Sequence, residues 1–533
     1  MTYARLQATD PGQWRAAALA WRSWAAIIGR WVSDLGGQVV TLRSAWSGTA
    51  ATAAVDFLGR LRRRLTLVRV LCWAADQALS EFAAALARAR ALLARAVATA
   101  GAAGLVIDDR GRVTAPRRVA DPAAPLRVAY RAAADEAAVN ATVTQLSAAL
   151  TAAAAADASA SDRLSDLAEP EVPPQPATPL PPSTAAPEEV RRWWDGLTPA
   201  QRRWLAVTDP AWLGSRDGLP AAYRDLANRL RLDEQRAELD RAIAGADGPE
   251  LRRLRDLRAG LDRLEDRLNS DDGTRGYLLR LDLTADGRAA VALGDPDLAA
   301  NVLTQVPGMT ADLESYGREL SRAERIAARA AELDPASATS AVMWLDYDAP
   351  DFVDEAAGRS RAEAGAAALR RFQDGLRATH EGEPARLTVL GHSYGSLVVG
   401  TAAATAGLEA DDVVFAGSPG VGVESAGELH VSPGHVWSTT SWADVIQYTA
   451  LAPDGLIKDL ALARALPLAG PLLAFGLPED ELWHGRNPSD PEFGARVFHS
   501  QPDAGHLGYW EPGRPALDAL ANITLGRGDV IPR

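Results

Sequence analysis

The sequence predicts a two-part chain, in which a long all-α hairpin domain precedes an α/β domain with a mostly parallel sheet covered on both faces. Three observations support this prediction. Apolar residues recur at helical spacing through residues 1–165, short apolar runs alternate with helices from about residue 271, and Gly391–Gly395 lies between a strand-like run and a small-residue helix. Strands that alternate with helices in this way form parallel sheets with helices on both faces.

The first domain, residues 1–165, is predicted to contain two long helices that pair as an antiparallel hairpin. The first helix carries a seven-residue repeat with a neighbouring seam of tryptophans. These positions are Trp14, Trp21, Ile28, Leu35 and Leu42, with Trp24 and Trp31 beside them. From Leu58 to Leu93 the apolar residues alternate steps of three and four, as in a coiled-coil seam, and Cys72 is one of these core positions. A small β-hairpin over 106–113 and a helix over about 126–167 follow.

The two amphipathic helices around Trp46-Ser47-Gly48 resemble the WXG100-like proteins linked to type VII secretion in actinobacteria. The resemblance implies a helical partner or self-association through the hairpin, and export by a type VII-like route without a cleaved signal peptide. The chain departs from the family's pattern after the second helix, where Tyr130 is followed at the fourth position by Ala134 rather than by an acidic residue. A structural or dimerising hairpin fits the same helical pattern.

Residues 166–188 are rich in proline, alanine, serine and threonine, which predicts an extended linker. Residues 189–270 predict a helical connecting module, with Trp193-Trp194 near its start and leucines at helical spacing from Leu251 to Leu268. This module either caps the next domain or is a spacer that packs on it.

The α/β domain, residues 271–533, is predicted from its short apolar runs. The expected strands are 277–282, 288–293, 301–306, 341–346, 385–390, 412–417, 435–440 and 496–500. Helices are expected from about 310 to 333, from 355 to about 379, and directly after Ser393. This alternation gives a sheet of the α/β type.

The stretch Gly391-His392-Ser393-Tyr394-Gly395 fits the Gly-x-Ser-x-Gly nucleophile elbow, in which a serine occupies a tight turn between a strand and a helix. The glycines are needed because any side chain would collide in that turn. The flanking strand and helix give the context of an α/β-hydrolase fold. A serine hydroxyl attacks only when a base removes its proton and donors hold the oxyanion, so the domain should also supply those groups.

The segment from about Trp193 onward resembles an actinobacterial α/β-hydrolase family of the DUF1023 type. The motifs that carry the resemblance are Trp193-Trp194, Asp217-Gly218-Leu219-Pro220, Ala227-Asn228-Arg229, Val306-Pro307-Gly308-Met309, Leu345-Asp346-Tyr347-Asp348-Ala349-Pro350, Gly391-His392-Ser393-Tyr394-Gly395-Ser396 and Ala416-Gly417-Ser418-Pro419-Gly420. The resemblance implies a serine-hydrolase fold and no established substrate.

The acid of a triad should follow Ser393 in the chain and end a later strand, because these folds keep the order Ser, Asp or Glu, then His. Asp444 follows the strand predicted at 435–440 and is the expected acid. Asp412 precedes its strand and so lies at the other end of the sheet. Asp490 and Asp503 lack a suitable preceding strand.

The base should lie beyond the last strand. His506 is in a loop after residues 496–500 and is the expected base, in preference to His499 within that strand. His392 is expected to point away from its neighbour Ser393, because the turn alternates side-chain directions.

Two backbone amides are expected to form the oxyanion hole. One is that of Tyr394, right after the nucleophile, and the other is that of Met309, in the loop after the third strand, with Gly308 as second choice. Gly308 is expected to supply an unusual backbone conformation that aims the Met309 amide inward. A plain strand-ending turn is the alternative.

The connection between Asp444 and His506 is long and apolar, and prolines divide its 451–492 segment. We expect this segment to form a wall or lid over an acyl pocket, with Leu472, Leu473 and Phe475 against the substrate. Packing of these side chains in an ordinary core is the alternative.

These residues predict a serine hydrolase, carboxylesterase- or lipase-like, that cleaves an ester, thioester or similar acyl bond of a small molecule or lipid. A type VII secretion-associated interaction protein, or an exported effector with weak or no catalysis, is the alternative. The net charge of −13 argues against a nucleic-acid partner. No metal and no cofactor are expected, because no histidine pair has the close spacing of a metal site.

Neither a signal peptide nor a transmembrane segment is expected. The N-terminus leads into a helix with tryptophan and arginine, and the longest charge-free apolar run is shorter than the roughly 20 residues that span a bilayer. The chain is therefore expected in the cytoplasm, or outside the cell by the type VII-like route.

Overall fold

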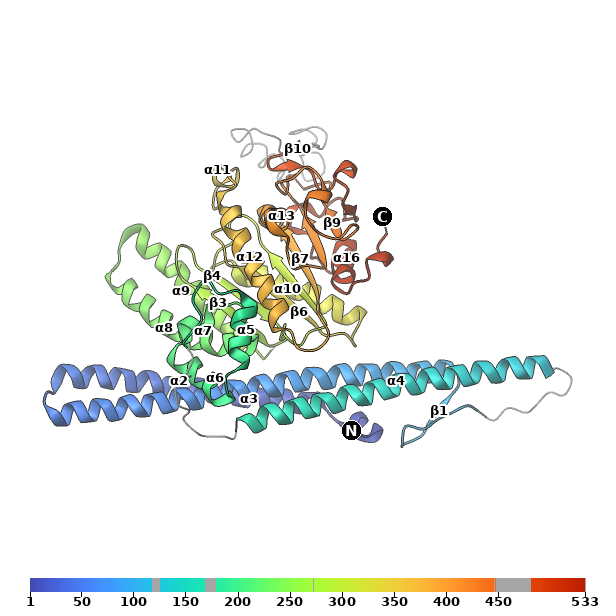
Figure 1. Cartoon of the computed structure of the whole chain (residues 1–533), viewed down its shortest axis with the longest axis horizontal. Coiled ribbons are helices and arrows are strands. Elements are labelled where there is room, and N and C mark those ends of the chain that lie inside the picture. Colours follow the sequence, from blue (N-terminus) through green and yellow to red (C-terminus); the bar gives the residue numbers. More distant parts are fainter. Residues whose placement is uncertain (117–124, 168–178, 272, 445, 447–480, 533) are drawn as a thin grey trace. The chain divides into compact units, whose positions relative to one another are not determined.

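The chain divides into two compact units, Met1–Glu171 and Val172–Arg533, in a computed structural model (Figure 1). The structure describes residues 1–116, 125–167, 179–271, 273–444, 446 and 481–532. The first unit is helical apart from one small hairpin in its described part, and the second contains the large sheet. The predicted order, an all-α region followed by an α/β domain, is confirmed.

Three long helices make up most of the first unit. Its elements are α1 (Tyr3–Ala8), α2 (Pro11–Ala45), α3 (Thr49–Ala102), β1 (Val106–Ile107), β2 (Val113–Thr114) and α4 (Pro125–Asp166). Asp10 caps α2, because its carboxylate accepts a hydrogen bond from the Gly12 amide at 2.9 Å. Gly48 leads into α3 with φ 107°, a conformation that side chains rarely adopt. α2 then packs against α3, as the pattern predicts.

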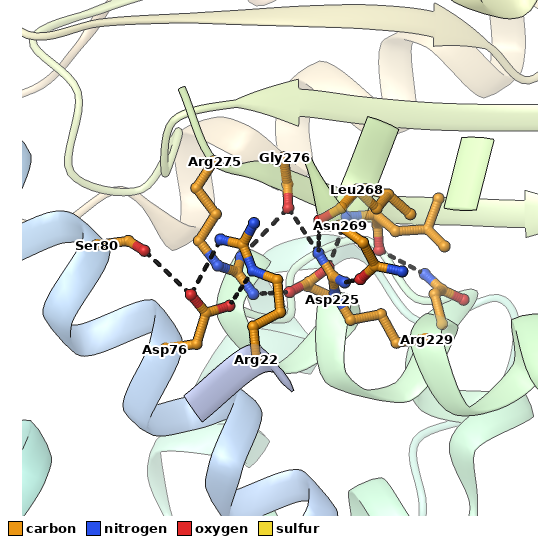
Figure 2. A network of polar contacts seen from close by, with 11 residues as sticks. Arg22, Asp76, Ser80, Asp225, Arg229, Leu268, Asn269, Arg275 and Gly276 are labelled. Carbon is orange, nitrogen blue, oxygen red and sulfur yellow. Dashed lines mark hydrogen bonds and ion pairs between the residues drawn. The ribbon is translucent and has the colours of Figure 1, made fainter. Parts of the chain in front are cut away.

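The tryptophans of α2 are not the core of this hairpin, contrary to the sequence prediction. Trp24 and Trp31 are 52% and 50% exposed, and Trp14, Trp21 and Trp46 are also exposed. The buried positions of α2 are Ala18, Arg22, Ala25 and Ile28, so Ile28 is the residue of the predicted seven-residue repeat that is buried. Figure 2 shows Arg22 paired with the buried Asp76 of α3, at 3.0 Å.

The seam predicted on α3 is buried only in its second half. Val68 is 44% exposed, whereas Cys72 and the seam residues after it are buried. The end of this seam, including Phe82 and Leu93, belongs to a cluster that also contains Leu146 and Ala149 of α4. α3 therefore has two successive helical partners rather than one.

The second unit begins with a run of helices and continues as a sheet with interspersed helices. The initial helices are α5 (Pro187–Asp195), α6 (Pro199–Thr208), α7 (Pro210–Gly214), α8 (Ala221–Gly245) and α9 (Gly248–Asn269). The strands of the main sheet are β3 (Gly276–Asp282), β4 (Arg288–Leu293), β5 (Asn301–Val306), β6 (Thr339–Leu345), β7 (Arg386–His392), β8 (Asp412–Ala416), β9 (Val436–Thr439) and β12 (Arg496–Val497). The later helices are α10 (Tyr316–Leu333), α11 (Val353–Ala356), α12 (Ser360–Thr379), α13 (Tyr394–Ala406) and α16 (Pro515–Thr524). A small hairpin of β10 (Glu481–Leu482) and β11 (Gly485–Arg486) stands apart from the main sheet.

The main sheet has the strand order β12-β9-β8-β7-β5-β6-β4-β3. Only the pairs β3–β4 and β4–β6 are antiparallel, so the predicted mostly parallel sheet is confirmed. The chain moves from β5 to β6 in one direction and from β7 to β8 in the other, so the order reverses between β5 and β7. In open α/β sheets, ligands bind outside the carboxyl ends of the strands at such a reversal.

Helices cover both faces of the sheet. Each central strand places alternate residues on opposite sides, and these residues pack against different helices. On one face, Leu303 and Leu390 belong to the same cluster as Ile326 of α10 and Leu520 of α16. On the other face, Val389 shares a cluster with residues of α12 and α13. The central strands are therefore buried on both faces and are rich in apolar residues rather than alternating between apolar and polar ones.

The helices before the sheet are fixed to its outer strand, β3. Asp225 of α8 is fully buried and accepts hydrogen bonds from Arg229 Nε at 2.8 Å and Arg275 Nη2 at 2.9 Å (Figure 2). It also accepts one from the Leu278 amide at 2.9 Å. Burial raises the pKa of Asp225, but the two guanidinium groups and the amide outweigh it, and the net direction is downward. Asn228 adds a bond from its side-chain amide to Leu278 O at 3.0 Å. This helical module is thus anchored at the strand farthest along the sheet from β12.

Candidate active site

Ser393 stands between the last residue of β7 and the first residue of α13, as the elbow motif predicts. Its backbone has φ 53° and ψ −130°, a region that costs a non-glycine residue about 1–3 kcal/mol. Two hydrogen bonds hold this conformation, from the Ser393 amide to Ala416 O at 3.0 Å and from the Ser396 amide to Ser393 O at 2.9 Å. The turn therefore keeps a strained serine at the carboxyl end of a central strand.

The two glycines of the motif are required by packing. A Cβ added to Gly391 would lie 2.6 Å from Ser396 Cα, and one added to Gly395 would lie 2.4 Å from Val306 O. Both contacts are with backbone atoms, which cannot move aside as a flexible side chain can. The elbow can thus form only where both positions are glycine.

The loop after β5 lies directly against the nucleophile. A Cβ added to Gly308 would lie 2.5 Å from Ser393 Cβ and 3.1 Å from Ser393 Oγ. The unusual backbone conformation expected at Gly308 is wrong, because Gly308 is not among the residues with positive φ. In this loop the positive φ, 62°, belongs to Thr310, and Gly308 is needed for close approach instead. The Tyr347 hydroxyl supports the loop with a hydrogen bond to Pro307 O at 2.6 Å.

The two expected oxyanion donors are the amide of Tyr394, at the start of α13, and the amide of Met309, in the loop after β5. Tyr394 is the first residue of α13, and its amide has no acceptor within the helix. Within the described residues, the Met309 amide also donates to no protein acceptor, whereas the next amide, that of Thr310, bonds to Pro350 O at 2.8 Å. Neither N–H group thus has a protein acceptor within the described residues.

The structure brings Asp444 and His506 together. Asp444 follows β9, and His506 lies in the 3₁₀ turn Gly505–Leu507 beyond β12. His506 Nδ1 is 2.9 Å from Asp444 Oδ1 and 3.0 Å from Oδ2. The Asp444 side chain is fully buried, and that of His506 is 28% exposed.

Neutral donors complete the surroundings of Asp444. The Tyr509 hydroxyl donates to Asp444 Oδ2 at 2.5 Å, and the Ile446 amide donates to Oδ1 at 3.0 Å. Tyr509 is itself fixed, because its hydroxyl accepts a bond from the Ser441 amide at 3.0 Å. Burial and the neighbouring Asp444 carboxylate hold the pKa of Tyr509 well above its ordinary value, so it remains a donor.

The electrostatics of the pair favour a proton on His506. Burial lowers the pKa of His506, but the charge of Asp444 and its hydrogen bond outweigh burial, and the net pKa is raised. Arg322 opposes this shift and Glu319 adds to it. An imidazole with a raised pKa accepts a proton readily, as a general base must.

Gly417 shows how tightly this corner is packed. A Cβ added to it would lie 2.6 Å from Asp444 Oδ2 and 3.1 Å from His506 Nδ1. In the described part of the chain, Ser393 Oγ forms no hydrogen bond to the His506 ring. Such bonds are often long in free enzymes and tighten when substrate is bound.

The other carboxylates considered as the acid are engaged elsewhere. Asp412, at the start of β8, binds Arg386 and His435. Asp490 caps a 3₁₀ turn by accepting from the Glu492 amide at 2.6 Å, and Asp503 pairs with Arg514 at 2.7 Å.

The alternative base, His499, is exposed. Moreover, β12 ends at Val497, so His499 lies after the strand rather than within it, contrary to the sequence prediction. His392, which sequence reasoning left out of the site, is buried, and its Nε2 lies 3.0 Å from His506 O.

The remaining expectations concern substrate, metal and membrane. Leu472, Leu473 and Phe475 lie outside the described residues. Among the side chains that the structure describes, no group of three or more His, Cys, Asp or Glu is arranged to hold a metal ion. No helix in the described ranges combines the length and apolarity needed to cross a bilayer.

Comparison with known families places the site in context. Residues 282–453 match the model of a family described as alpha/beta hydrolase. The match includes the elbow and Asp444 and ends before His506.

Several mycobacterial proteins are similar to this chain. An uncharacterized protein of Mycobacterium tuberculosis is 32% identical over 407 residues, which cover 69% of this chain and 60% of that protein. Another uncharacterized protein of the same species is 37% identical over 195 residues, covering 35% of this chain and 71% of that protein. An uncharacterized protein of Mycobacterium bovis matches to the same extent. The chain thus spans only 60% of the length of the first relative.

Proposed function

Because the chain belongs to the α/β-hydrolase family, we propose that it is a serine hydrolase in which Ser393, His506 and Asp444 form a catalytic triad. The observation that carries this proposal is the pairing of His506 Nδ1 with Asp444 at 2.9 Å, at the same end of the sheet as the strained elbow serine. The expected substrate is an ester, thioester or similar acyl compound, small or lipid-like.

In the proposed reaction, His506 Nε2 takes the proton of Ser393 as Oγ bonds to the acyl carbon. The carbonyl electron pair moves onto oxygen, and the amides of Tyr394 and Met309 bind the oxyanion. The intermediate collapses, the bond to the leaving group breaks, and His506 returns the proton to that group. Water then attacks the acyl-enzyme with His506 again as base, which releases the acid and restores Ser393.

Asp444 has two roles in this scheme. It accepts the Nδ1–H of His506, which leaves Nε2 free to receive the serine proton, and its charge stabilises the imidazolium. Tyr509 and the Ile446 amide hold the carboxylate in place without neutralising it. The negative charge of Asp444 therefore has no cationic partner in this scheme other than the imidazolium of His506.

The geometry of Ser393 supports the role of nucleophile. Strained backbone at a non-glycine residue persists only where the surroundings enforce it, and such residues gather at functional sites. Here Gly308, Gly391 and Gly395 each leave room that a side chain would fill. The fold thus accommodates an arrangement that has no evident benefit for stability.

The decisive test is labelling with a fluorophosphonate, followed by peptide mapping of the label. We expect the label on Ser393, and we expect Ser393→Ala to abolish labelling and nitrophenyl-ester hydrolysis with unchanged circular dichroism. Ser396→Ala is the matched control, because Ser396 is in the same turn but donates to Gly391 O at 3.0 Å. Labelling of another residue, or full turnover by Ser393→Ala, would contradict the proposal.

A further inference from the structure

The ring of His392, the residue before the nucleophile, connects the elbow to the loop that carries the base. It is buried, and its Nε2 lies 3.0 Å from the backbone oxygen of His506. A carbonyl oxygen can only accept, so Nε2 carries the proton and donates. The two imidazole rings lie side by side, with centroids 4.7 Å apart.

Two further aromatic side chains pack against the His392 ring. Trp510 meets it edge-on, with centroids 4.8 Å apart, and Tyr509 meets it at 6.3 Å. Trp510 is itself covered by the guanidinium of Arg322, 4.9 Å from its ring centroid. In the described part of the chain, the Trp510 Nε1 has no hydrogen-bond partner, so this ring is held by packing.

The surroundings keep His392 neutral. Burial, His506 and Arg322 together hold the pKa of His392 well below its ordinary value. A neutral imidazole has one N–H, and the bond to His506 O uses it. Arg322 is in turn paired with Glu319 of α10, at 2.5 Å. The ring is therefore a fixed neutral donor and not a second base.

We propose that His392 is a positioning residue, whose Nε2–H holds the main chain of His506 at a fixed distance from Ser393. The proposal rests on the triad proposed above. His392 is the last residue of the central strand β7 and directly precedes Ser393, so its ring connects the position of the nucleophile to the loop beyond β12. That loop has few regular hydrogen bonds of its own, because His506 lies in a 3₁₀ turn of three residues.

Two anchors then fix the base. Asp444 holds the His506 ring at Nδ1, and His392 holds its backbone at the carbonyl. With the ring and the backbone of His506 both fixed, the direction in which its Nε2 points is restricted. Displacement of a catalytic group by about 1 Å can lower a rate about a hundredfold, so a lost backbone anchor should reduce turnover more than substrate binding.

The test compares His392→Leu with His392→Gln in the full chain, using nitrophenyl acetate. Leu fills the space without a donor, whereas the Gln side-chain amide can reach the position of Nε2 and donate to His506 O. We expect Leu to lower kcat about 10- to 100-fold with KM changed less than about threefold. Gln should restore kcat to within about threefold of the wild type.

Three comparisons separate this proposal from a loss of folding or of the triad itself. His380→Leu is the matched control, because His380 Nε2 also bonds to a backbone oxygen, Glu383 O at 2.8 Å, at the opposite end of the sheet. It should lower the melting temperature without lowering kcat. Fluorophosphonate labelling of wild type and Ser393→Ala tests the triad separately. An unlabelled Ser393 in the wild type contradicts the triad.

If Ser393 is labelled in the wild type but His392→Leu has the same kcat as the wild type, the positioning role is contradicted and the triad is not. The same conclusion follows if His392→Gln is as slow as His392→Leu. If His392→Leu does not fold, His392→Asn replaces it, because its amide is too short to reach His506 O. Asn as fast as Gln would then overturn the proposal, and Asn slower than Gln by about tenfold would support it.

Discussion

The main sheet has a histidine–aspartate pair at each end. At the carboxyl end, His506 Nδ1 is 2.9 Å from Asp444, and at the amino end His435 Nδ1 is 2.9 Å from Asp412. Both carboxylates are buried. The distances alone therefore do not distinguish a catalytic pair from a structural one.

The difference lies in the other partners of each carboxylate. Asp412 also binds the Arg386 guanidinium, at 2.9 Å from Nε and 2.5 Å from Nη2, and the Trp437 indole at 3.0 Å. Its charge is thus already compensated by a cation. Asp444 receives neutral donors from Tyr509 and Ile446, and its ion-pair partner within the described part of the chain is His506. A carboxylate surrounded by neutral donors retains its charge for the imidazolium.

Removing the charge of each carboxylate gives the largest expected contrast. Asp444→Asn should lower kcat about 10³- to 10⁴-fold, because the amide stabilises the wrong tautomer of His506 and supplies no charge. Asp412→Asn should lower the melting temperature, since Arg386 loses its partner, and leave kcat within about twofold. Stopped-flow or steady-state ester hydrolysis with parallel thermal melts measures both.

A second variant can replace Asp412→Asn in this comparison. If Asp412→Asn does not fold, His435→Gln removes the same pair with a milder change. Equal losses of kcat at both ends would show that the pairs act through stability, and the distinction drawn from their partners would be wrong.

The pH dependence of activity should reveal the charge on Asp444. Burial lowers the pKa of His506 but Asp444 outweighs it, so the net value lies above the ordinary 6.5. His506 must be neutral to act as base, and activity is therefore lost as pH falls through this raised pKa. We expect the acid limb of kcat/KM to have its midpoint above 6.5, measured with nitrophenyl acetate between about pH 5 and pH 9.

Asp412→Asn should keep the wild-type midpoint, because that carboxylate is at the other end of the sheet. The residual activity of Asp444→Asn should have its midpoint at lower pH, since burial remains and the charge is gone. A wild-type midpoint below 6.5 would contradict the raised pKa.

The sequence predicted the sheet and its elbow because both depend on local chemistry. Buried parallel strands such as β5 and β7 are short runs rich in valine and leucine, and the match to an alpha/beta hydrolase model agrees with the predicted fold class. The elbow needs glycine at Gly391 and Gly395 for packing reasons that any chain with this turn shares. Chain order then indicated Asp444 and His506 as acid and base, and their catalytic roles stay predictions.

Contacts between distant residues could not be predicted in this way. Tyr509 reaches Asp444 from across 65 positions of the sequence, and His392 meets His506 across 114. A heptad pattern likewise shows that α2 is amphipathic but not which stripe is covered, so it predicts Trp24 and Trp31 at a seam, whereas the buried positions are Ala18, Arg22, Ala25 and Ile28. The WXG100-like resemblance of the hairpin and the secretion route stay predictions.

The smallest contrast concerns the neutral donors of the two carboxylates. Tyr509→Phe removes the hydroxyl that donates to Asp444 Oδ2 at 2.5 Å, and Trp437→Phe removes the indole N–H that donates to Asp412 Oδ1 at 3.0 Å. Losing one hydrogen bond to a charged group is worth about 1.5–3 kcal/mol, but the Ile446 amide and His506 still hold Asp444. We therefore expect Tyr509→Phe to lower kcat about tenfold with little change in KM.

Trp437→Phe should leave kcat unchanged. It should lower the melting temperature, because the Arg496 guanidinium packs 4.0 Å from the Trp437 ring centroid and this contact with the indole is lost. Tyr509→Phe thus tests whether the hydroxyl orients the proposed catalytic carboxylate of Asp444, and Trp437→Phe tests whether the indole stabilises the structural carboxylate of Asp412. Equal kcat values for Tyr509→Phe and wild type would mean that the backbone alone orients Asp444. In that case the surroundings of the two carboxylates would differ only in charge. The Arg386 guanidinium beside Asp412 would then be sufficient to explain why the His435–Asp412 pair has no catalytic role.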